Sequence, residues 1–87
     1  MPMNRKRLKN LREQAGLTQE ELARRANVSV SLVSKYERGE ERNPTTKTLL
    51  ALSRVLSPLL GKSVNQVLTE LATPGELEAG KEGGANG

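Results

Sequence analysis

The segment from Thr18 to Gly39 constrains the fold of this chain more than any other feature. Thr18 and Glu21 have the spacing of a capping box. In such a box the threonine hydroxyl accepts from the backbone N–H of the glutamate, and the glutamate carboxylate accepts from the backbone N–H of the threonine. The apolar residues that follow fall on one helical face: Leu22, Ala23 and Ala26. The segment is therefore predicted to open with a short amphipathic helix.

A tight turn and a second helix complete this segment. Asn27 stands where the first helix must stop, and asparagine tolerates the left-handed conformation that such a stop needs. Val28 supplies an apolar side chain to the turn, and Ser29 is placed to cap the next helix. In that helix only Val33 and Tyr36 have a clear inward spacing. The pattern predicts two helices joined by a turn of about four residues, which is the helix-turn-helix arrangement.

The second of these helices should turn small, hydroxyl and basic side chains toward solvent. These residues are Val30, Ser31, Ser34, Lys35 and Arg38. Side chains of these kinds can enter the major groove of DNA beside its phosphates. A single tyrosine and no other aromatic residue argue against a binder of single strands, which needs several stacking side chains.

The order and spacing of these residues continue without a gap from Leu17 to Pro44. The matching segments are Leu17–Ala23, Val28–Ser29, Val33–Gly39, Asn43–Pro44 and Leu49–Leu50. They resemble the DNA-binding domain of the Cro and phage-repressor family, also called xenobiotic-response-element-type helix-turn-helix regulators. The resemblance extends over about residues 5–71. It implies an all-α, compact five-helix domain with the helix-turn-helix at its second and third helices.

The resemblance also implies a role for each matching residue. The residues that match base-reading positions are Val30, Ser31, Ser34 and Lys35. Those that match or flank positions facing the DNA backbone are Gln19, Ser29, Leu32, Arg38, Arg42, Asn43 and Lys47. Arg12 and Glu37 match a structural ion pair between the first and third helices. Many relatives carry glutamine where this chain has Val30, which can contact only a thymine methyl group, so Lys35 becomes the best candidate for reading a base.

In the rest of the chain, helix-capping and helix-breaking residues indicate where the other helices begin and end. A first helix is expected over Arg5–Ala15, after a short arm, Met1–Asn4. A fourth helix should start near Thr45 and end at Ser57–Pro58, because the residue before proline avoids the α region. A second capping box, Ser63–Gln66, should open the fifth helix. Residues 1–72 would then form the DNA-binding domain, and residues 73–87 a flexible tail rich in glycine and glutamate, predicted to be disordered.

The segment Ser57–Leu60 departs from the family pattern, because relatives usually run from the fourth helix directly into a glycine. It resembles an insertion before Gly61, which leaves the position of the fifth helix open. Apolar residues gather in this region and make a candidate dimer surface: Leu59, Leu60, Val64, Val67, Leu68 and Leu71. The alternative is that they cap the core beneath the first helix.

The charge distribution and the missing residue types exclude several classes of function. The net charge is +4, but residues 1–62 carry +7 and residues 63–87 carry −3, so the body suits a polyanionic partner. The absence of His, Cys and Asp removes the usual catalytic triads and zinc or calcium sites. No enzyme activity and no metal site are therefore expected. We also expect no cofactor, no ligand domain and no self-cleaving peptidase domain. Without an apolar run of about 18 residues, the chain is expected to be a cytoplasmic protein that does not enter membranes.

These features predict a sequence-specific regulator of transcription that binds double-stranded DNA. We expect a repressor that acts as a homodimer on palindromic operators in the cytoplasm, at the nucleoid. One alternative is an antitoxin or adaptor that mainly binds a partner protein, a toxin or another regulator, and binds DNA only for autoregulation. A weaker alternative is a structural nucleoid protein with little preference for sequence.

Overall fold

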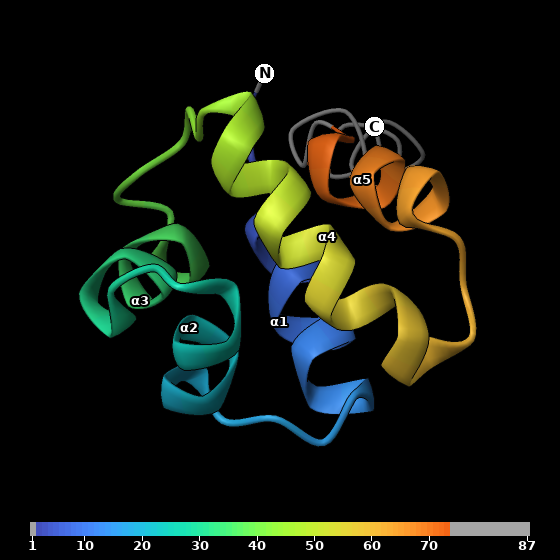
Figure 1. Cartoon of the computed structure of the whole chain (residues 1–87). Coiled ribbons are helices and arrows are strands. Elements are labelled where there is room, and N and C mark those ends of the chain that lie inside the picture. The colour runs from blue at the N-terminus through green and yellow to red at the C-terminus, as the bar shows by residue number, and fades with distance from the viewer. Residues whose placement is uncertain (1, 74–87) are drawn as a thin grey trace, which may run out of the picture.

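The computed structural model describes residues 2–73, which form five helices and no strand, as the sequence predicts. The helices are α1 (Arg5–Gln14), α2 (Gln19–Ala26), α3 (Val30–Arg38), α4 (Thr46–Leu60) and α5 (Val64–Ala72). Figure 1 shows α4 lying across α1 in the middle of the molecule, with α2 and α3 on one side and α5 on the other. The predicted tail beyond Thr73 lies outside the described residues.

Each helix begins at a polar side chain that accepts a hydrogen bond from the backbone N–H three residues further on. These caps are Asn4, Thr18, Ser29, Thr45 and Ser63. At Thr18 the full capping box forms: Glu21 N–H donates to Thr18 Oγ1 at 3.0 Å, and Thr18 N–H donates to Glu21 Oε1 at 2.9 Å. At Ser63 only the serine half forms, so the second capping box is half correct. Side-chain caps thus fix the start of every helix.

The turn inside the helix-turn-helix follows the expected path. Asn27 ends α2 with φ 59°, and it is the one residue other than glycine with positive φ among those described. Val28 N–H donates to Ala23 O at 2.9 Å, and the Val28 side chain packs against the core. The turn is therefore held both by backbone bonds and by apolar contact, which fixes the angle between α2 and α3.

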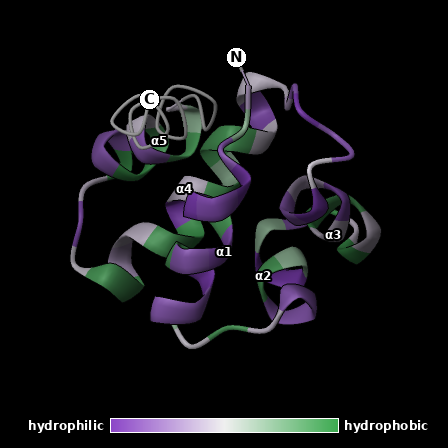
Figure 2. Cartoon of the chain, turned by 180° about the vertical axis from the view of Figure 1, so that it is seen from behind, coloured by the Kyte–Doolittle hydropathy of each residue, from purple (hydrophilic) through white to green (hydrophobic). Residues whose placement is uncertain are grey.

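All five helices contribute to one apolar core. Figure 2 shows the apolar colour mainly on the sides of the helices that face one another. Buried leucines and valines dominate, and several are completely inaccessible: Leu8, Leu22, Val33, Leu52, Leu56, Val67 and Leu71. Each such side chain contributes about 1.5–3 kcal/mol by leaving water. Packing, more than helix propensity, therefore holds these short helices in place.

The expected end of the fourth helix at Ser57–Pro58 is wrong, because α4 continues to Leu60 with Pro58 inside it. A proline inside a helix removes the hydrogen bond from its own nitrogen and crowds the carbonyl four residues earlier. Here that loss falls in the last turn, while Leu56 is buried and Leu60 packs against the core beyond it. Gly61 then ends the helix with φ 66°. The apparent insertion is about one more turn of α4.

Helix α5 packs against α4 and α1, and its C-terminal end meets the start of the chain. Val67 and Leu71 are completely buried, so placing them on a dimer surface was wrong; they complete the core. The expected N-terminal arm is also part of the body. Met3 N–H donates to Arg42 O at 2.6 Å, and Asn4 N–H donates to Leu71 O at 2.7 Å. Residues 3 and 4 thereby join the α3–α4 loop to the end of α5.

Candidate nucleic-acid interface

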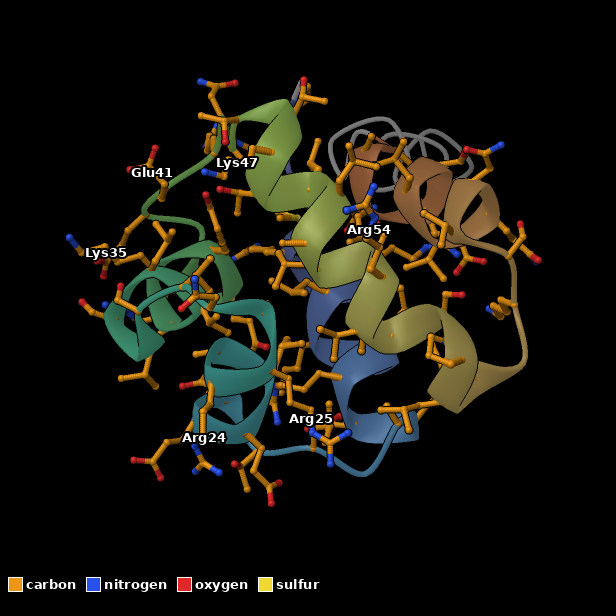
Figure 3. The ribbon with its side chains drawn as sticks, in the orientation of Figure 1. Arg24, Arg25, Lys35, Glu41, Lys47 and Arg54 are labelled. Carbon is orange, nitrogen blue, oxygen red and sulfur yellow. The ribbon has the colours of Figure 1, made fainter. Side chains whose placement is uncertain are left out.

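One face of α3 is open to solvent along most of its length. Val33 and Tyr36 are buried on the opposite face and anchor the helix. Val30 is 44% exposed at the first turn, Ser31 and Lys35 are exposed, and Ser34 is half-buried. Figure 3 shows Lys35 pointing away from the body of the protein. A methyl pair, hydroxyls and an ammonium group thus line an outward helical surface.

Arg38 lies at the end of this surface and is held by two side chains. Its Nε and Nη2 donate to Glu40 Oε2 and Oε1 at 2.9 and 3.1 Å, and its Nη1 donates to Ser34 Oγ. Since Ser34 Oγ accepts from Arg38, its own proton remains available for another acceptor. The hydrogen bonds within the exposed pair raise the pKa of Arg38 and lower the pKa of Glu40.

The α3–α4 loop carries further polar side chains beside α3. Arg42, Asn43 and Lys47 are all exposed, while Pro44 between them is buried. Figure 3 places Lys47 at the start of α4, on the same side of the molecule as Lys35. The loop is tied to the body through the bond from Met3 to Arg42 O described above. Basic and amide groups therefore lie between α3 and α4 as well, beyond the two exposed acids Glu40 and Glu41.

Arg5 joins α1 to the C-terminal end of α3. Its Nη1 donates to Arg38 O at 3.5 Å, and its side chain lies directly over Gly39. Gly39 has φ 79°, and a Cβ added there would lie 3.1 Å from Arg5 Cδ. Only glycine accepts both the backbone conformation and this close approach easily. The sequence placed Arg5 at the start of the first expected helix but gave no sign of this contact.

Glu37 is the acid that anchors the inner side of the helix-turn-helix. Arg12 Nε donates to Glu37 Oε2 at 2.7 Å, and Arg12 Nη2 donates to Glu37 Oε1 at 3.0 Å. The two side chains are only 11% and 4% exposed. Arg12 Nη1 also donates to Leu17 O at 2.8 Å. This network ties α1, the α1–α2 turn and α3 together. The hydrogen bonds that Arg12 donates to Glu37 raise the pKa of Arg12, against the opposing effect of burial.

Gln19, the first residue of α2, reaches the same carboxylate. Its Nε2 donates to Glu37 Oε1 at 2.9 Å, and the side chain is half-buried. An amide nitrogen carries two protons, so one remains for an acceptor outside the protein. The first turn of a helix also offers backbone N–H groups and a positive dipole end. The start of α2 is thus a second place with donors suited to an anion.

Leu32 does not fit the role expected for it at the DNA backbone. Its side chain packs against the core, and its N–H already donates to Ser29 O and Oγ at 3.1 and 3.0 Å. Leu32 therefore has no free donor for a phosphate, and that expectation is wrong. The sequence reasoning also gave no role to Glu40. Its position two residues after Arg38, across a helix-ending glycine, was the available signal.

The remaining candidates for a dimer surface lie at the junction of α4 and α5. Leu59 is 43% exposed, which makes it one of the two large apolar side chains exposed in residues 2–73. Leu60, Val64 and Leu68 are partly buried. Figure 2 shows the end of α4 in the apolar colour, on the far side of the molecule from α3. An apolar surface therefore exists away from the α3 face.

Within residues 2–73, no helix is long and apolar enough to span a bilayer. The acidic residues of the same range include no group of three or more that could hold a metal ion.

Comparison with known proteins assigns the family. The Helix-turn-helix family model HTH_3, of the Cro/C1 type, matches residues 8–57, which run from α1 through α3 and most of α4. The chain belongs to the Cro/C1-type helix-turn-helix family. This family comprises DNA-binding regulators of transcription, and the prediction of family and fold is confirmed.

Two proteins similar to this chain are regulators by name. The chain is 36% identical over 84 residues to the HTH-type transcriptional regulator ImmR of Bacillus subtilis (strain 168), with 76% of this chain and 65% of ImmR covered. The chain thus spans about two thirds of the length of ImmR. It also resembles the clp gene regulator ClgR of Corynebacterium glutamicum, with a TM-score of 0.68 and 32% identity over 94% of this chain and 82% of ClgR. These relatives are transcriptional regulators, a class distinct from enzymes.

Proposed function

We propose that this chain binds double-stranded DNA sequence-specifically, with α3 in the major groove, and represses transcription as a homodimer. The observation that carries the proposal is the outward face of α3, with small and basic side chains on a helix anchored by Val33, Tyr36 and the ion pair of Glu37. Recognition in the groove favours a rigid helix, because ordering a loosely held helix on binding would cost free energy and lower the affinity.

Four residues of α3 are proposed to read bases. Lys35 is exposed and can donate to O6 and N7 of guanine. Val30 offers methyl groups for the methyl group of thymine, and it excludes bases that need a hydrogen-bonding partner. Ser31 and Ser34 supply hydroxyls; in Ser34 the proton is free to donate, since Arg38 already occupies an acceptor site on its oxygen. Readout by this set should favour guanine and thymine edges.

The residues around α3 are proposed to hold the DNA backbone. They lie at the start of α2, at the cap and end of α3, in the α3–α4 loop and at the start of α4: Gln19, Ser29, Arg38, Arg42, Asn43 and Lys47. Gln19 would use the proton that Glu37 leaves free, beside the helix N-terminus. Contacts of this kind position the reading helix and make affinity fall with salt, but they carry no sequence information.

Dimerisation is proposed through the apolar side chains at the junction of α4 and α5. One helix-turn-helix reads few base pairs, and two related copies would read half-sites centred about 34 Å apart. Leu59, Leu60, Val64 and Leu68 supply the exposed and partly buried apolar atoms, away from α3. A two-fold dimer requires a palindromic operator. A dimer bound over a promoter would exclude the polymerase, which is why we assign repression.

The exposed Leu59 also favours a second candidate, an antitoxin or adaptor whose main task is to bind a partner protein. A single exposed leucine surface could serve a second copy or a different protein. The two candidates differ in DNA binding by the isolated chain: the repressor should bind operators tightly alone, whereas the adaptor should need its partner.

Selection of bound sequences from a random duplex pool, with the purified chain alone, tests the proposal. The expected result is a palindromic consensus bound at least about 10³-fold more tightly than random DNA. Enrichment of a single half-site would contradict the dimer but would still agree with sequence reading by α3. No enrichment, together with weak binding to every duplex, would contradict specific recognition and favour the adaptor or the nucleoid protein.

A further inference from the structure

Two adjacent acids stand in the loop that follows the reading helix, although this part of the chain is basic overall. Glu40 binds Arg38 through both carboxylate oxygens, at 2.9 and 3.1 Å, whereas Glu41 makes no ion pair among the described residues. Arg38 and Glu40 are 52% and 56% exposed. Exposed pairs of this kind add little to stability. The geometry of Glu40 therefore calls for an explanation other than holding the fold.

We propose that Glu40 restrains DNA affinity by occupying the guanidinium of Arg38, so that it competes with a DNA phosphate for that group. This inference rests on the function proposed above. A carboxylate and a phosphate both accept from guanidinium in a bidentate way, with two parallel N–H···O bonds. Glu40 makes such a contact on the Nε and Nη2 edge of Arg38.

The other side of the guanidinium is also taken in the free chain. Arg38 Nη1 donates to Ser34 Oγ, so all three nitrogens of Arg38 have a partner. A phosphate can bind the same edge only after the Glu40 carboxylate leaves. Glu40 would then lie without its cation close to a phosphate, and like charges repel at this range. Phosphate binding by Arg38 therefore costs the Arg38–Glu40 ion pair and also places the Glu40 carboxylate near a like charge.

The restraint is proposed to act on the contact of Arg38 with the DNA backbone. Of the four residues proposed to read bases, only Ser34 is bonded to the Arg38 side chain. Glu40 does contact Lys35 through the backbone, where its N–H donates to Lys35 O at 2.9 Å. Its carboxylate, however, bonds to Arg38 and, among the described residues, makes no hydrogen bond or ion pair with the side chains of Val30, Ser31 or Lys35. Phosphates are present in every sequence, so Glu40 weakens binding to random and preferred duplexes by the same factor. Its effect is to lower the affinity for every duplex while the preference between duplexes stays the same.

Glu41 provides a matched control in the same loop. It is exposed, carries the same charge and stands one residue further along, without an ion pair to Arg38. Figure 3 shows its side chain directed outward from the loop. Glu40→Gln and Glu41→Gln change the net charge equally, but only the first releases Arg38. A difference between them therefore reports the pair and not the charge of the loop.

The experiment measures dissociation constants of the full chain for a random-sequence duplex and for its preferred duplex at about 0.1 M salt. Glu40→Gln should tighten binding to both by the same factor, about threefold to tenfold, and Glu41→Gln by no more than about twofold. In an Arg38→Gln background the effect of Glu40→Gln should fall to that of Glu41→Gln. Circular dichroism and thermal unfolding confirm that the variants fold.

The restraint would be overturned if Glu40→Gln and Glu41→Gln had equal effects on affinity. It would also be overturned if Glu40→Gln kept its full effect in the Arg38→Gln background. Neither result would contradict DNA binding itself. A native chain that binds no duplex at all would overturn the proposed function, and this inference with it. The two failures are therefore distinguishable in one set of titrations.

Discussion

Gln19 and Glu37 share a hydrogen bond of 2.9 Å that joins the first residue of α2 to the inner side of α3. The acceptor, Glu37 Oε1, is the same atom that receives Arg12 Nη2 at 3.0 Å. One nearly buried carboxylate therefore holds three elements together and also orients an amide that we assign to a DNA phosphate. The proposed phosphate contact of Gln19 therefore depends on the same carboxylate oxygen as the ion pair that stabilises the fold.

The Arg12–Glu37 pair should contribute far more to the free energy of unfolding than a surface ion pair does. Arg12→Ala and Glu37→Ala should each lower the free energy of unfolding by about 3 kcal/mol, because each leaves a shielded charge without its partner. The two losses should be strongly non-additive in a double-mutant cycle followed by chemical denaturation. Additive losses below about 1 kcal/mol would contradict the shielded pair.

Lys35 should carry sequence information that Lys47 does not. Lys35→Ala is expected to weaken binding to the preferred duplex by about 1–3 kcal/mol and to relax the choice of one base pair in each half-site. Lys47→Ala removes an equal charge at the start of α4 and should weaken all duplexes alike. Competition titrations against single-base variants of the preferred site measure both. If Lys35→Ala also weakens all sequences equally, Lys35 contacts only phosphate.

Leu59 should support self-association, since it is exposed at the end of α4 and its loss leaves the core intact. Leu59→Glu is expected to shift the protein toward monomer and to weaken binding to a full palindrome, with the thermal midpoint nearly unchanged. Sedimentation equilibrium measures the first effect. Asn10→Glu adds the same charge at an exposed site of α1 and serves as the control. Unchanged dimerisation in Leu59→Glu would place the interface elsewhere.

Tyr36 should titrate above the ordinary pKa of tyrosine, which is about 10. Its burial raises its pKa, the neighbouring charge of Glu41 adds to the rise, and a hydrogen bond with Thr48 opposes it. A pKa raised in the folded state contributes stability that is complete below the pKa of the unfolded chain and is lost as pH rises through the folded value. The chain has one tyrosine and no tryptophan, so absorbance at alkaline pH reports this group alone.

Tyr36→Phe is the matching control, because it removes the titrating group and keeps the ring. The free energy of unfolding of the native chain should fall above about pH 10, and that of Tyr36→Phe should fall less. An ordinary pKa in the folded chain, or identical alkaline losses in the two proteins, would contradict a desolvated phenol.

Local signals predicted the helix-turn-helix well. The caps at Thr18 and Ser29 and the left-handed Asn27 depend on groups only a few residues apart, so the sequence contains all that is needed. The inward spacing of Val33 and Tyr36 likewise follows from helical periodicity. The Arg12–Glu37 contact spans 25 residues, and it could be anticipated only from the resemblance to a known family.

The errors have a common physical origin, because each depends on contacts between distant segments. Pro58 stops a helix by local rules, but the packing of Leu56 and Leu60 carries α4 past it. Val67 and Leu71 seemed surplus to a small core, yet α5 turns them inward against α1 and α4. The Arg38–Glu40 pair was missed for a different reason. It is local, but it depends on the left-handed turn at Gly39 that brings the two side chains together.

The most direct test of groove binding by α3 is the pattern of dimethyl sulfate protection on the preferred duplex. The reagent methylates guanine N7 in the major groove and adenine N3 in the minor groove, so one experiment reports on both. The account predicts protection of guanine N7 in each half-site, lost at one guanine per half-site when Lys35 is changed to alanine. Protection confined to adenine N3, or none at guanine N7, would contradict the placement of α3 in the major groove.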